Sequence, residues 1–444
     1  MRSAKKESLM NLQMKYVAGM TVLALACGLN AQSASQNQAP KYYVFNLGAP
    51  LGGNPEPVGI NDLGWISGGA NLASNNVVNA ELWIGAPVDL GTLGGPSSNI
   101  SWPNHSTQGE IVGIAETAEA NPYQEPWSCF AFFPSATPTG DVCLGFAWRN
   151  GVMSPLPALP GGYDSYAADV NNRGQVVGWA EDGIHDSTCN KPTQVLQFEA
   201  VIWGPNLTEM TQLSPYPGDP DSAATAINDS GEVVGISGLC SNAVGGASAI
   251  HALLWENGKP VDLGNIGGKA WNTPTSLNNR GEIVGFANTS GDENAALSPV
   301  SFLWTKETGK MEKLPRLDDD QTSAAYDVNE RGQIVGVSNG GPIGSRAFLY
   351  QNGKIFDLNS LLVGDSALYL LIAQGINDRG EIVGTALDSG GQQVGFLAVP
   401  AYGDEGEPGS MQATGSPERN VVLPANFHPQ LTGFSRLVFA AMQK

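Results

Sequence analysis

The sequence predicts an all-β protein, namely a seven-bladed β-propeller with four antiparallel strands in each blade. Three observations predict this fold. An eight-residue unit returns seven times, a pair of strand-like segments recurs between its copies, and the chain opens with a strand-like segment that the last repeat lacks. The composition agrees, because 56 Gly, 29 Pro and only 14% charged residues in 444 favour short strands joined by tight turns.

The eight-residue unit combines a turn with a short apolar strand. Its turn glycine returns at intervals of 45, 65, 57, 50, 51 and 48 residues. The seven copies are Asn61–Gly68, Ser106–Gly113, Asn171–Gly178, Asn228–Gly235, Asn278–Gly285, Asn329–Gly336 and Asn377–Gly384.

Each part of the unit has a physical reason. Asn favours the first position of a type I turn, since its side chain accepts from the backbone two residues on. Gly three residues later can adopt the left-handed conformation that closes a bulged hairpin. Ser106 replaces Asn in the second copy and also suits this position. The glycine that ends each unit predicts close approach between the backbones of neighbouring sheets.

Between these units lies a strand that ends in an aromatic residue, a turn, and another strand. The first such pair is Ala80–Trp83 with Val88–Gly91. Five more follow: Phe146–Trp148 with Val152–Leu156, Val201–Trp203 with Glu209–Leu213, Ala252–Trp255 with Val261–Gly264, Ser301–Trp304 with Met311–Leu314, and Ala347–Tyr350 with Ile355–Leu358. Each repeat therefore holds four strands, which is the content of one propeller blade.

The two ends of the repeat region predict closure of the ring. Tyr42–Gly48 resembles a fourth strand but precedes the first unit, whereas the last copy ends at a third strand, Val394–Val399. The N-terminal strand would complete the last blade and leave no open edge. We place the small-residue segment before each turn innermost and the Asp-Leu strand outermost. The alternative order begins each blade at the Trp strand.

The repeat as a whole resembles the HAF family of probable extracellular repeats. The resemblance rests on Ala252–Trp255, Val261–Gly264 and Ser276–Gly285, and it recurs in register over residues 42–399. His251–Leu253 and Arg346–Phe348 stand where that family has its His-Ala-Phe triplet, from which most blades depart. The resemblance implies an exported repeat protein and implies no reaction.

The N-terminus predicts export. Arg2 and three lysines precede an apolar run that ends near Ala31, so residues 1–31 are expected to be a cleaved signal peptide. The alternative is a membrane anchor, for which the apolar run is short. Residues 32–400 form the predicted propeller, 401–419 a linker and 420–444 a short tail. The expected location is secreted, periplasmic or at the cell surface.

The mature chain would carry 18 basic and 41 acidic residues, a net charge of −23. Such a surface repels phosphate backbones and excludes nucleic acid as a partner. The charge keeps an exported protein in solution or, alternatively, attracts cationic partners. We expect a monomer without a membrane span after cleavage.

All four cysteines of the mature chain lie in the long links between second and third strands. An even number in an exported chain predicts two disulfides, and three pairings fit. We favour Cys129–Cys143, within one loop, and Cys189–Cys240, between adjacent blades. A metal site is the competing interpretation, but no Cys-x-x-Cys spacing supports it.

The same links contain the candidate binding residues, because variable loops on a rigid scaffold carry binding sites. Aromatic residues of the blade-two loop either stack on a ligand or form a small core of their own; they are Tyr123, Trp127, Phe130, Phe132 and Phe133. In blade three, Asp182, His185 and Asp186 either hold a cation or are simply solvated. No cofactor or metal is expected, and no motif supports a structural cation such as calcium.

No catalytic residue is predicted, since nucleophile elbows, phosphate loops and zinc-binding helices are absent from the sequence. The function expected is therefore non-catalytic: a binding or scaffolding module for a protein or glycan on the variable loop face. The alternative is an exported enzyme acting on polysaccharide, with its site at the loop-side end of the propeller axis.

Overall fold

The computed structural model describes most of the chain between residues 39 and 401. The described stretches are 39–48, 53–72, 77–133, 139–240, 250–268, 271–289, 298–341 and 344–401. The predicted signal peptide and tail, and all but the first residue of the predicted linker, lie outside them. The propeller belongs to the unit that begins at Tyr42. In the described stretches, no helix is both long enough and apolar enough to cross a membrane.

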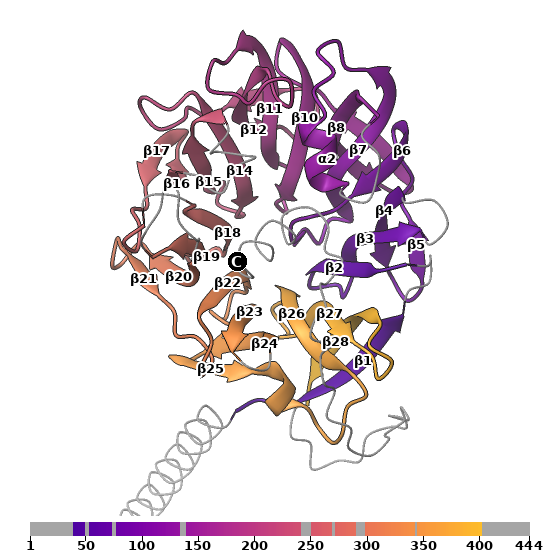
Figure 1. The fold of residues 1–444 in the computed structure, drawn as a ribbon, viewed down its shortest axis with the longest axis vertical. Helices are drawn as coiled ribbons and strands as arrows, with labels where there is room; N and C mark the ends of the chain where they lie inside the picture. The colour runs from indigo at the N-terminus through magenta and orange to yellow at the C-terminus, as the bar shows by residue number, and fades with distance from the viewer. Residues whose placement is uncertain are drawn as a thin grey trace, which may run out of the picture. The chain divides into compact units, whose positions relative to one another are not determined.

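Seven antiparallel four-stranded sheets surround a common axis (Figure 1). From the innermost strand outward, the first three blades are β2 (Pro55–Ile60), β3 (Ile66–Leu72), β4 (Val77–Trp83), β5 (Pro87–Asp89); β6 (Gly94–Asn99), β7 (Glu110–Ala120), β8 (Asp141–Arg149), β9 (Val152–Leu156); and β10 (Gly161–Val170), β11 (Val176–His185), β12 (Leu196–Trp203), β13 (Met210–Gln212). The next three are β14 (Asp221–Ile227), β15 (Val233–Gly238), β16 (His251–Glu256), β17 (Lys259–Asp262); β18 (Thr273–Leu277), β19 (Glu282–Asn288), β20 (Pro299–Thr305), β21 (Met311–Lys313); and β22 (Thr322–Val328), β23 (Ile334–Gly341), β24 (Gly344–Gln351), β25 (Lys354–Asp357). The last blade is β26 (Tyr369–Ile376), β27 (Ile382–Leu387), β28 (Gln393–Pro400) and β1 (Tyr42–Gly48).

This topology confirms the predicted fold, strand order and closure, and the order that begins at the Trp strand is wrong. β1 pairs with β28, the third strand of blade seven, in antiparallel register from Tyr42 opposite Pro400 to Phe45 opposite Leu397. Tyr42 is buried, and its carbonyl also accepts from Val363 N at 2.9 Å in the segment after β25. The N-terminal strand therefore fastens the seventh blade to the first part of the chain.

The turn asparagines join each blade to the next. In blade six, Asn329 Oδ1 accepts from the backbone N–H groups of Arg331 and Gln333, both at 3.0 Å. Asn329 Nδ2 donates to Gln333 Oε1 and to the backbone oxygen of Asn377 in blade seven, both at 2.9 Å. Asn377 in turn donates to the backbone oxygen of Asn61 at 3.1 Å, so the chain of bonds passes across the closure. One residue type thus fixes the turn and the contact between blades.

The glycine that ends each unit lies where two backbones approach closely, but within one sheet. A Cβ on Gly336 would stand 2.1 Å from the carbonyl oxygen of Ala324, on the adjacent strand of the same blade. The prediction that this approach joins neighbouring sheets is therefore wrong. The close approach is caused by a β-bulge in the innermost strand, seen as a register shift between Ala325 and Asp327, which displaces that strand.

In blades three and four, the Trp of the third strand ties the blade to the crossover before it. Trp203 and Trp255 are fully buried. Their indole Nε1 groups donate to Pro157 O at 3.1 Å and Ser214 O at 2.7 Å, in the crossovers that enter their own blades. Burial of such a side chain together with its polar atom stabilises the contact between blades.

Candidate functional site

The ring has two faces that differ in sequence character. The links from second to third strand and the crossovers between blades lie on one face, which we call the loop face. The hairpin turns that begin with Asn lie on the other, the turn face. Because strands alternate in direction, both assignments follow from the observed topology.

Most of the predicted aromatic group of the blade-two loop is packed into the protein. Residues 127–132 form the short helix α2 (Trp127–Phe132). Trp127 stacks on Phe198 with ring centroids 6.3 Å apart, and Phe132 stacks on Tyr166 at 4.2 Å. These contacts make the loop a small core over blades two and three, which is one of the two alternatives that the sequence allows.

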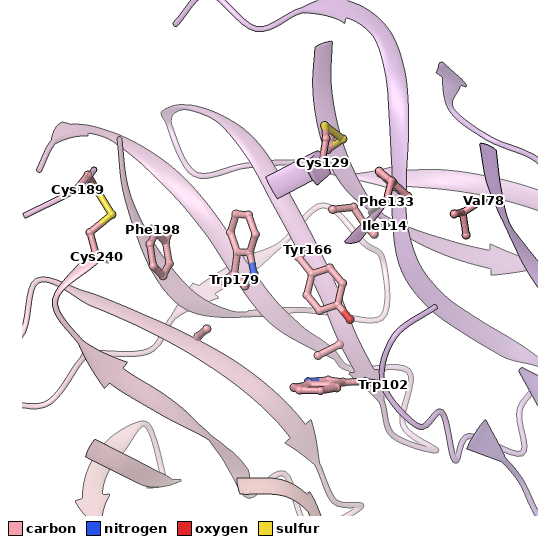
Figure 2. Close-up of a cluster of buried hydrophobic side chains, with 13 residues drawn as sticks. Val78, Trp102, Ile114, Cys129, Phe133, Tyr166, Trp179, Cys189, Phe198 and Cys240 are labelled. Carbon is pink, nitrogen blue, oxygen red and sulfur yellow. A yellow bond between two sulfur atoms is a disulfide. The ribbon is translucent and has the colours of Figure 1, made fainter. Parts of the chain in front are cut away.

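Two disulfides brace this core, in the pairing that the sequence favours (Figure 2). Cys129 of α2 and Cys143 have Cα atoms 5.7 Å apart, and Cys189 and Cys240, which join blades three and four, have Cα atoms 4.8 Å apart. Cys143 lies on β8 and not in the link as predicted, so the first bridge joins the link to the third strand. All four are buried in one apolar cluster with Phe133. Since the sulfur atoms are oxidised, they cannot supply thiolates to a metal.

Tyr123 differs from the other aromatic residues of the loop because 40% of it is exposed. Its ring makes edge-to-face contacts with Tyr163 at 5.9 Å and with the exposed His185 at 5.2 Å. The His185 Nε2 atom lies 3.2 Å from the Tyr123 hydroxyl. We call Tyr123, Tyr163 and His185 the aromatic platform. The side chain of Phe130, the remaining candidate, lies outside the described part of the chain.

The acidic candidates of blade three are held separately. Asp182 Oδ1 accepts from Ile184 N at 2.7 Å, while Asp186 accepts from Thr188 N at 2.8 Å and from its hydroxyl at 2.6 Å. Within the described stretches, Asp182, His185 and Asp186 do not bring one ligand atom each within 4.8 Å of one another. Asp182 and His185 lie at the end of β11 and Asp186 directly follows it, and each carboxylate accepts from the backbone N–H two residues further on.

Asp186 also faces a second buried carboxyl group. Asp221 is fully buried in β14, and its Oδ1 accepts from Phe198 N at 3.0 Å. Burial and the neighbouring Asp186 carboxylate raise the pKa of Asp221 to about 9. Although burial acts to raise the pKa of Asp186, a hydrogen bond with Asp221 holds it below its usual value. At neutral pH the pair therefore shares one proton beneath the Cys189–Cys240 loop.

Three more carboxyl groups lie fully buried beneath the aromatic platform: Glu125, Asp164 and Glu181. Glu181 accepts from Asp164 N at 2.9 Å and from Gln194 Nε2 at 2.8 Å, and Glu125 accepts from Leu196 N at 2.8 Å. Burial and the charges of Asp164 and Glu125 hold the pKa of Glu181 well above its usual value. These bonds tie the blade-two loop to blade three and so fix the platform above them.

On the turn face, a cavity of about 150 Å³ lies on the axis and is lined by all seven blades. We call it the axial cavity. Three successive positions line it in six of the turns, and the first two of these in blade two. The first positions are Ile60, His105, Val170, Ile227, Leu277, Val328 and Ile376; the second are Asn61, Ser106, Asn171, Asn228, Asn278, Asn329 and Asn377; and the third are Asp62, Asn172, Asp229, Asn279, Glu330 and Asp378.

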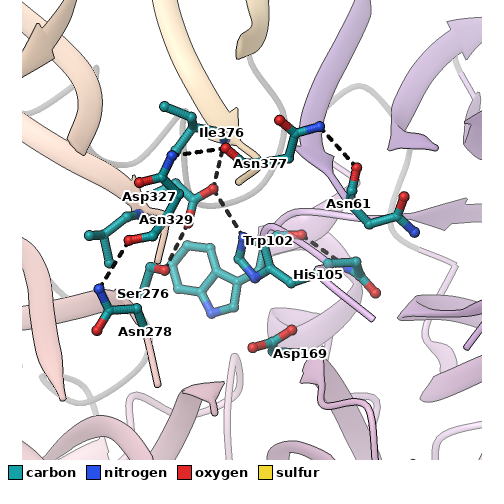
Figure 3. Close-up of polar contacts among 12 residues, drawn as sticks. Asn61, Trp102, His105, Asp169, Ser276, Asn278, Asp327, Asn329, Ile376 and Asn377 are labelled. Atoms are coloured by element: carbon teal, nitrogen blue, oxygen red, sulfur yellow. Dashed lines mark hydrogen bonds and ion pairs between the residues drawn. The ribbon is translucent and has the colours of Figure 1, made fainter. Parts of the chain in front are cut away.

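His105 replaces the aliphatic residue that the other six blades place in this wall. Its Nε2 atom lies 3.0 Å from Oδ2 of the buried Asp327, which comes from blade six, so the pair spans the axis (Figure 3). Asp327 also accepts from Ser276 Oγ, Val328 N and Ile376 N, each at 2.8 Å. Four bonds therefore hold this carboxylate in place.

Charge keeps this histidine protonated. Burial acts to lower the pKa of His105, but the charges of Asp327, Asp169 and Asp62 and the hydrogen bond with Asp327 raise it to about 10. Burial likewise acts to raise the pKa of Asp327, yet His105 holds it below its usual value. Burial raises the pKa of Asp169 to about 6. At neutral pH, His105 is a cation and a hydrogen-bond donor.

Sequence reasoning missed the axial cavity, although an alignment of the copies contains its signal. The residue before the turn Asn is Ile, Val or Leu in six copies and His105 in blade two. Ser98 and Ser165 occupy equivalent positions, because each hydroxyl accepts from the third strand of the preceding blade and donates to a backbone oxygen at or just past the end of that blade's fourth strand. Eight residues separate Ser98 from Ser106, against six from Ser165 to Asn171. Two extra residues therefore precede His105.

Comparison with known families gives one match. Residues 219–425, slightly less than half of the chain, match the model of a family described as a protein of unknown function (DUF3466). The matched region begins just before β14 and runs past β28, so its described part corresponds to blades four to seven. A comparison with curated proteins gives no match.

Several solved structures are similar to this chain. An acylaminoacyl peptidase from Pyrococcus horikoshii has a TM-score of 0.44 and 8% identity over 82% of this chain and 53% of the peptidase, so the chain spans about half the peptidase's length. An oligogalacturonate lyase from Vibrio parahaemolyticus has a TM-score of 0.42 and 10% identity, covering 80% and 93% of the two chains. An oligogalacturonate lyase in complex with manganese has a TM-score of 0.41 and 12% identity, covering 82% and 96%. Likeness at this level carries no conclusion about what this chain does.

Proposed function

We propose that this chain is an exported, non-catalytic binding module that recognises a glycan on its loop face through the aromatic platform. The observation that carries the proposal is the exposed Tyr123 ring, held edge-to-face between Tyr163 and His185. Aromatic rings that are fixed before binding offer apolar faces to sugar rings at little cost in conformational entropy.

The surroundings of the platform support this role. The two disulfides and the hydrogen bonds of the buried carboxyl groups near Glu181 hold the supporting loops in place. A preorganised binding surface requires such support. Asp182, half-buried on β11 three residues before His185, keeps a carboxylate near the platform for sugar hydroxyls. Disulfides are typical of proteins exported to oxidising compartments, and they support a secreted, periplasmic or cell-surface location. The resemblance to the HAF family remains part of the same proposal.

An exported enzyme acting on polysaccharide has less support. The histidine that meets carboxylates on the axis is His105, which lines the turn face and not the loop face. A general base needs an unprotonated nitrogen at working pH. Asp327 keeps His105 protonated, because its charge and hydrogen bond outweigh the effect of burial on the pKa. We therefore assign no catalytic role to this pair.

A printed glycan array with the mature protein identifies a ligand, and titration of that glycan against variants locates it. Tyr123→Ala removes the exposed ring of the platform, while Tyr43→Ala removes a ring of similar exposure (42%) on the outermost strand β1. We expect Tyr123→Ala to weaken binding roughly tenfold, about 1.4 kcal/mol, and Tyr43→Ala to leave it unchanged. An array without a bound glycan, or equal losses in both variants, contradicts the proposal. A protein partner lost on Tyr123→Ala would assign the platform to protein recognition instead.

A further inference from the structure

The axial cavity on the turn face carries an inference that is independent of the loop-face proposal. Its outer edge holds four carboxylates: Asp62, Asp229, Glu330 and Asp378. Each accepts a backbone N–H from the preceding blade at 2.7–2.8 Å. These bonds fix the carboxylates at the mouth of the cavity.

The negative charge at the mouth is not required for these bonds. Asn172 and Asn279 occupy the same position in their blades, and their amide oxygens accept the equivalent backbone N–H groups at 2.8 Å. A neutral amide therefore accepts the backbone N–H of the preceding blade as a carboxylate does. Carboxylates in the other blades add charge that the ring of blades does not need.

Three of the carboxylates stand on consecutive blades, six, seven and one, and form what we call the acidic arc: Glu330, Asp378 and Asp62. Asp229 is different, since Asn172 Nδ2 donates to its second oxygen at 2.9 Å. Burial and the charge of Asp62 raise the pKa of Asp378, and burial and the charge of Asp378 raise that of Glu330. These directions indicate like-charge repulsion along the arc. His105 acts against it at Asp378 and Arg280 at Glu330, and a bound cation would relieve it further.

The geometry of the arc favours an organic cation over a metal ion. In the stretches that the structure describes, the arc does not bring three ligand oxygens within 4.8 Å of one another. An ammonium group needs only hydrogen-bond acceptors around it, and its donors are directional. Inside the mouth, aliphatic side chains such as Ile376, Ile60 and Val328 line the wall and suit a short methylene chain.

His105 supplies a complementary group deeper in the cavity. About a third of its side chain is exposed, and Nε2 is engaged by Asp327. Among the described residues, its other ring nitrogen, Nδ1, makes no hydrogen bond. An acceptor on the ligand would satisfy this donor.

We propose that the axial cavity binds a small primary amine that carries a hydroxyl group. The ammonium group donates to the acidic arc, the methylene chain lies along the aliphatic wall, and the hydroxyl oxygen accepts from His105 Nδ1–H. No covalent step is involved.

A matched pair of probes tests the charge requirement. The compounds 3-amino-1-propanol and 1,3-propanediol have the same number of heavy atoms, and only the amine is charged at pH 7. Calorimetry or ligand-observed NMR in 0.15 M salt is expected to show millimolar binding of the amine and at least tenfold weaker binding of the diol. Equal binding of the two probes, or binding of neither, overturns the proposal.

A matched pair of variants tests the location. Asp378→Asn removes one charge from the arc and keeps the acceptor for Glu330 N, as Asn172 and Asn279 do naturally. Asp229→Asn makes the same change in the same rim, where Asn172 already engages the carboxylate. We expect Asp378→Asn to weaken amine binding at least fivefold, with an unchanged thermal midpoint. Asp229→Asn also loses the bond from Asn172 Nδ2, and we expect it to weaken amine binding no more than about twofold. Equal losses, or none, would place the amine elsewhere and refute the assignment.

Discussion

Replacement of one turn asparagine tests the structural account of the repeat. Asn329 is 4% exposed, and its amide takes part in four hydrogen bonds of 2.9–3.0 Å. Asn329→Ala leaves the N–H groups of Arg331 and Gln333 without their acceptor and the backbone oxygen of Asn377 without this donor. A buried polar group that loses its partner costs about 1–3 kcal/mol.

Because the turn is partly open to water, which replaces some of these bonds, we expect Asn329→Ala to lower the free energy of unfolding by about 2–4 kcal/mol. Asn329→Ser should lie between wild type and Ala. The natural Ser106 keeps one turn bond, from Gln108 N to its hydroxyl at 3.2 Å, but cannot donate to the next blade as an amide does.

Urea denaturation monitored by tryptophan fluorescence measures these differences. Asn206→Ala is the matched control, since Asn206 accepts two backbone N–H groups at 3.2 and 3.0 Å in an exposed outer turn. We expect that change to cost less than about 0.5 kcal/mol. The reasoning fails if Asn329→Ala is as mild as the control, or if Ser at 329 is as damaging as Ala.

Two further predictions concern the loop face. The Cys189–Cys240 and Cys129–Cys143 disulfides close chain segments of 51 and 14 residues and should stabilise the protein by about 4 and 3 kcal/mol. In the same urea titration, Cys189→Ala/Cys240→Ala should therefore destabilise the protein more than Cys129→Ala/Cys143→Ala. The opposite order would contradict the chain-entropy argument. The pKa of Asp221 is about 9 in the folded protein, against an ordinary value of 3.8. Between these two values Asp221 keeps a proton in the folded state that it loses in the unfolded chain. The free energy of unfolding should therefore fall as the pH rises from about 4 to about 9. Asp221→Asn cannot ionise and should have a flatter thermal midpoint between pH 5 and 9, whereas parallel profiles would contradict the raised pKa.

The fold could be predicted from local sequence because each repeat has the same turn and strand residues. The turn Asn, its glycine and the Trp strand recur in every blade or nearly so, and Tyr42–Gly48 is recognisable as a fourth strand. The partner of the closing glycine was predicted wrongly. Gly336 meets Ala324 of its own sheet, because an innermost-strand bulge decides that contact and periodicity does not reveal a bulge.

The candidate sites depend on contacts between distant residues, which one repeat cannot reveal. Trp127 and Tyr123 lie four residues apart in the same aromatic-rich loop, yet Trp127 is packed against Phe198 and Tyr123 is exposed. The difference depends on where blade three lies, because it places Phe198 against Trp127 but leaves Tyr123 partly open to solvent. The axial cavity is more remote still, since His105 meets Asp327 more than two hundred positions later. Its one sequence signal is a departure from the repeat at a single position.

The central claim is that the loop face recognises a glycan through the aromatic platform. A crystal structure of the full chain with the strongest array ligand tests it most directly. The account predicts a sugar ring in contact with Tyr123, Tyr163 and His185, with both disulfides intact. A sugar bound in the axial cavity, or on any surface away from these three residues, would contradict it.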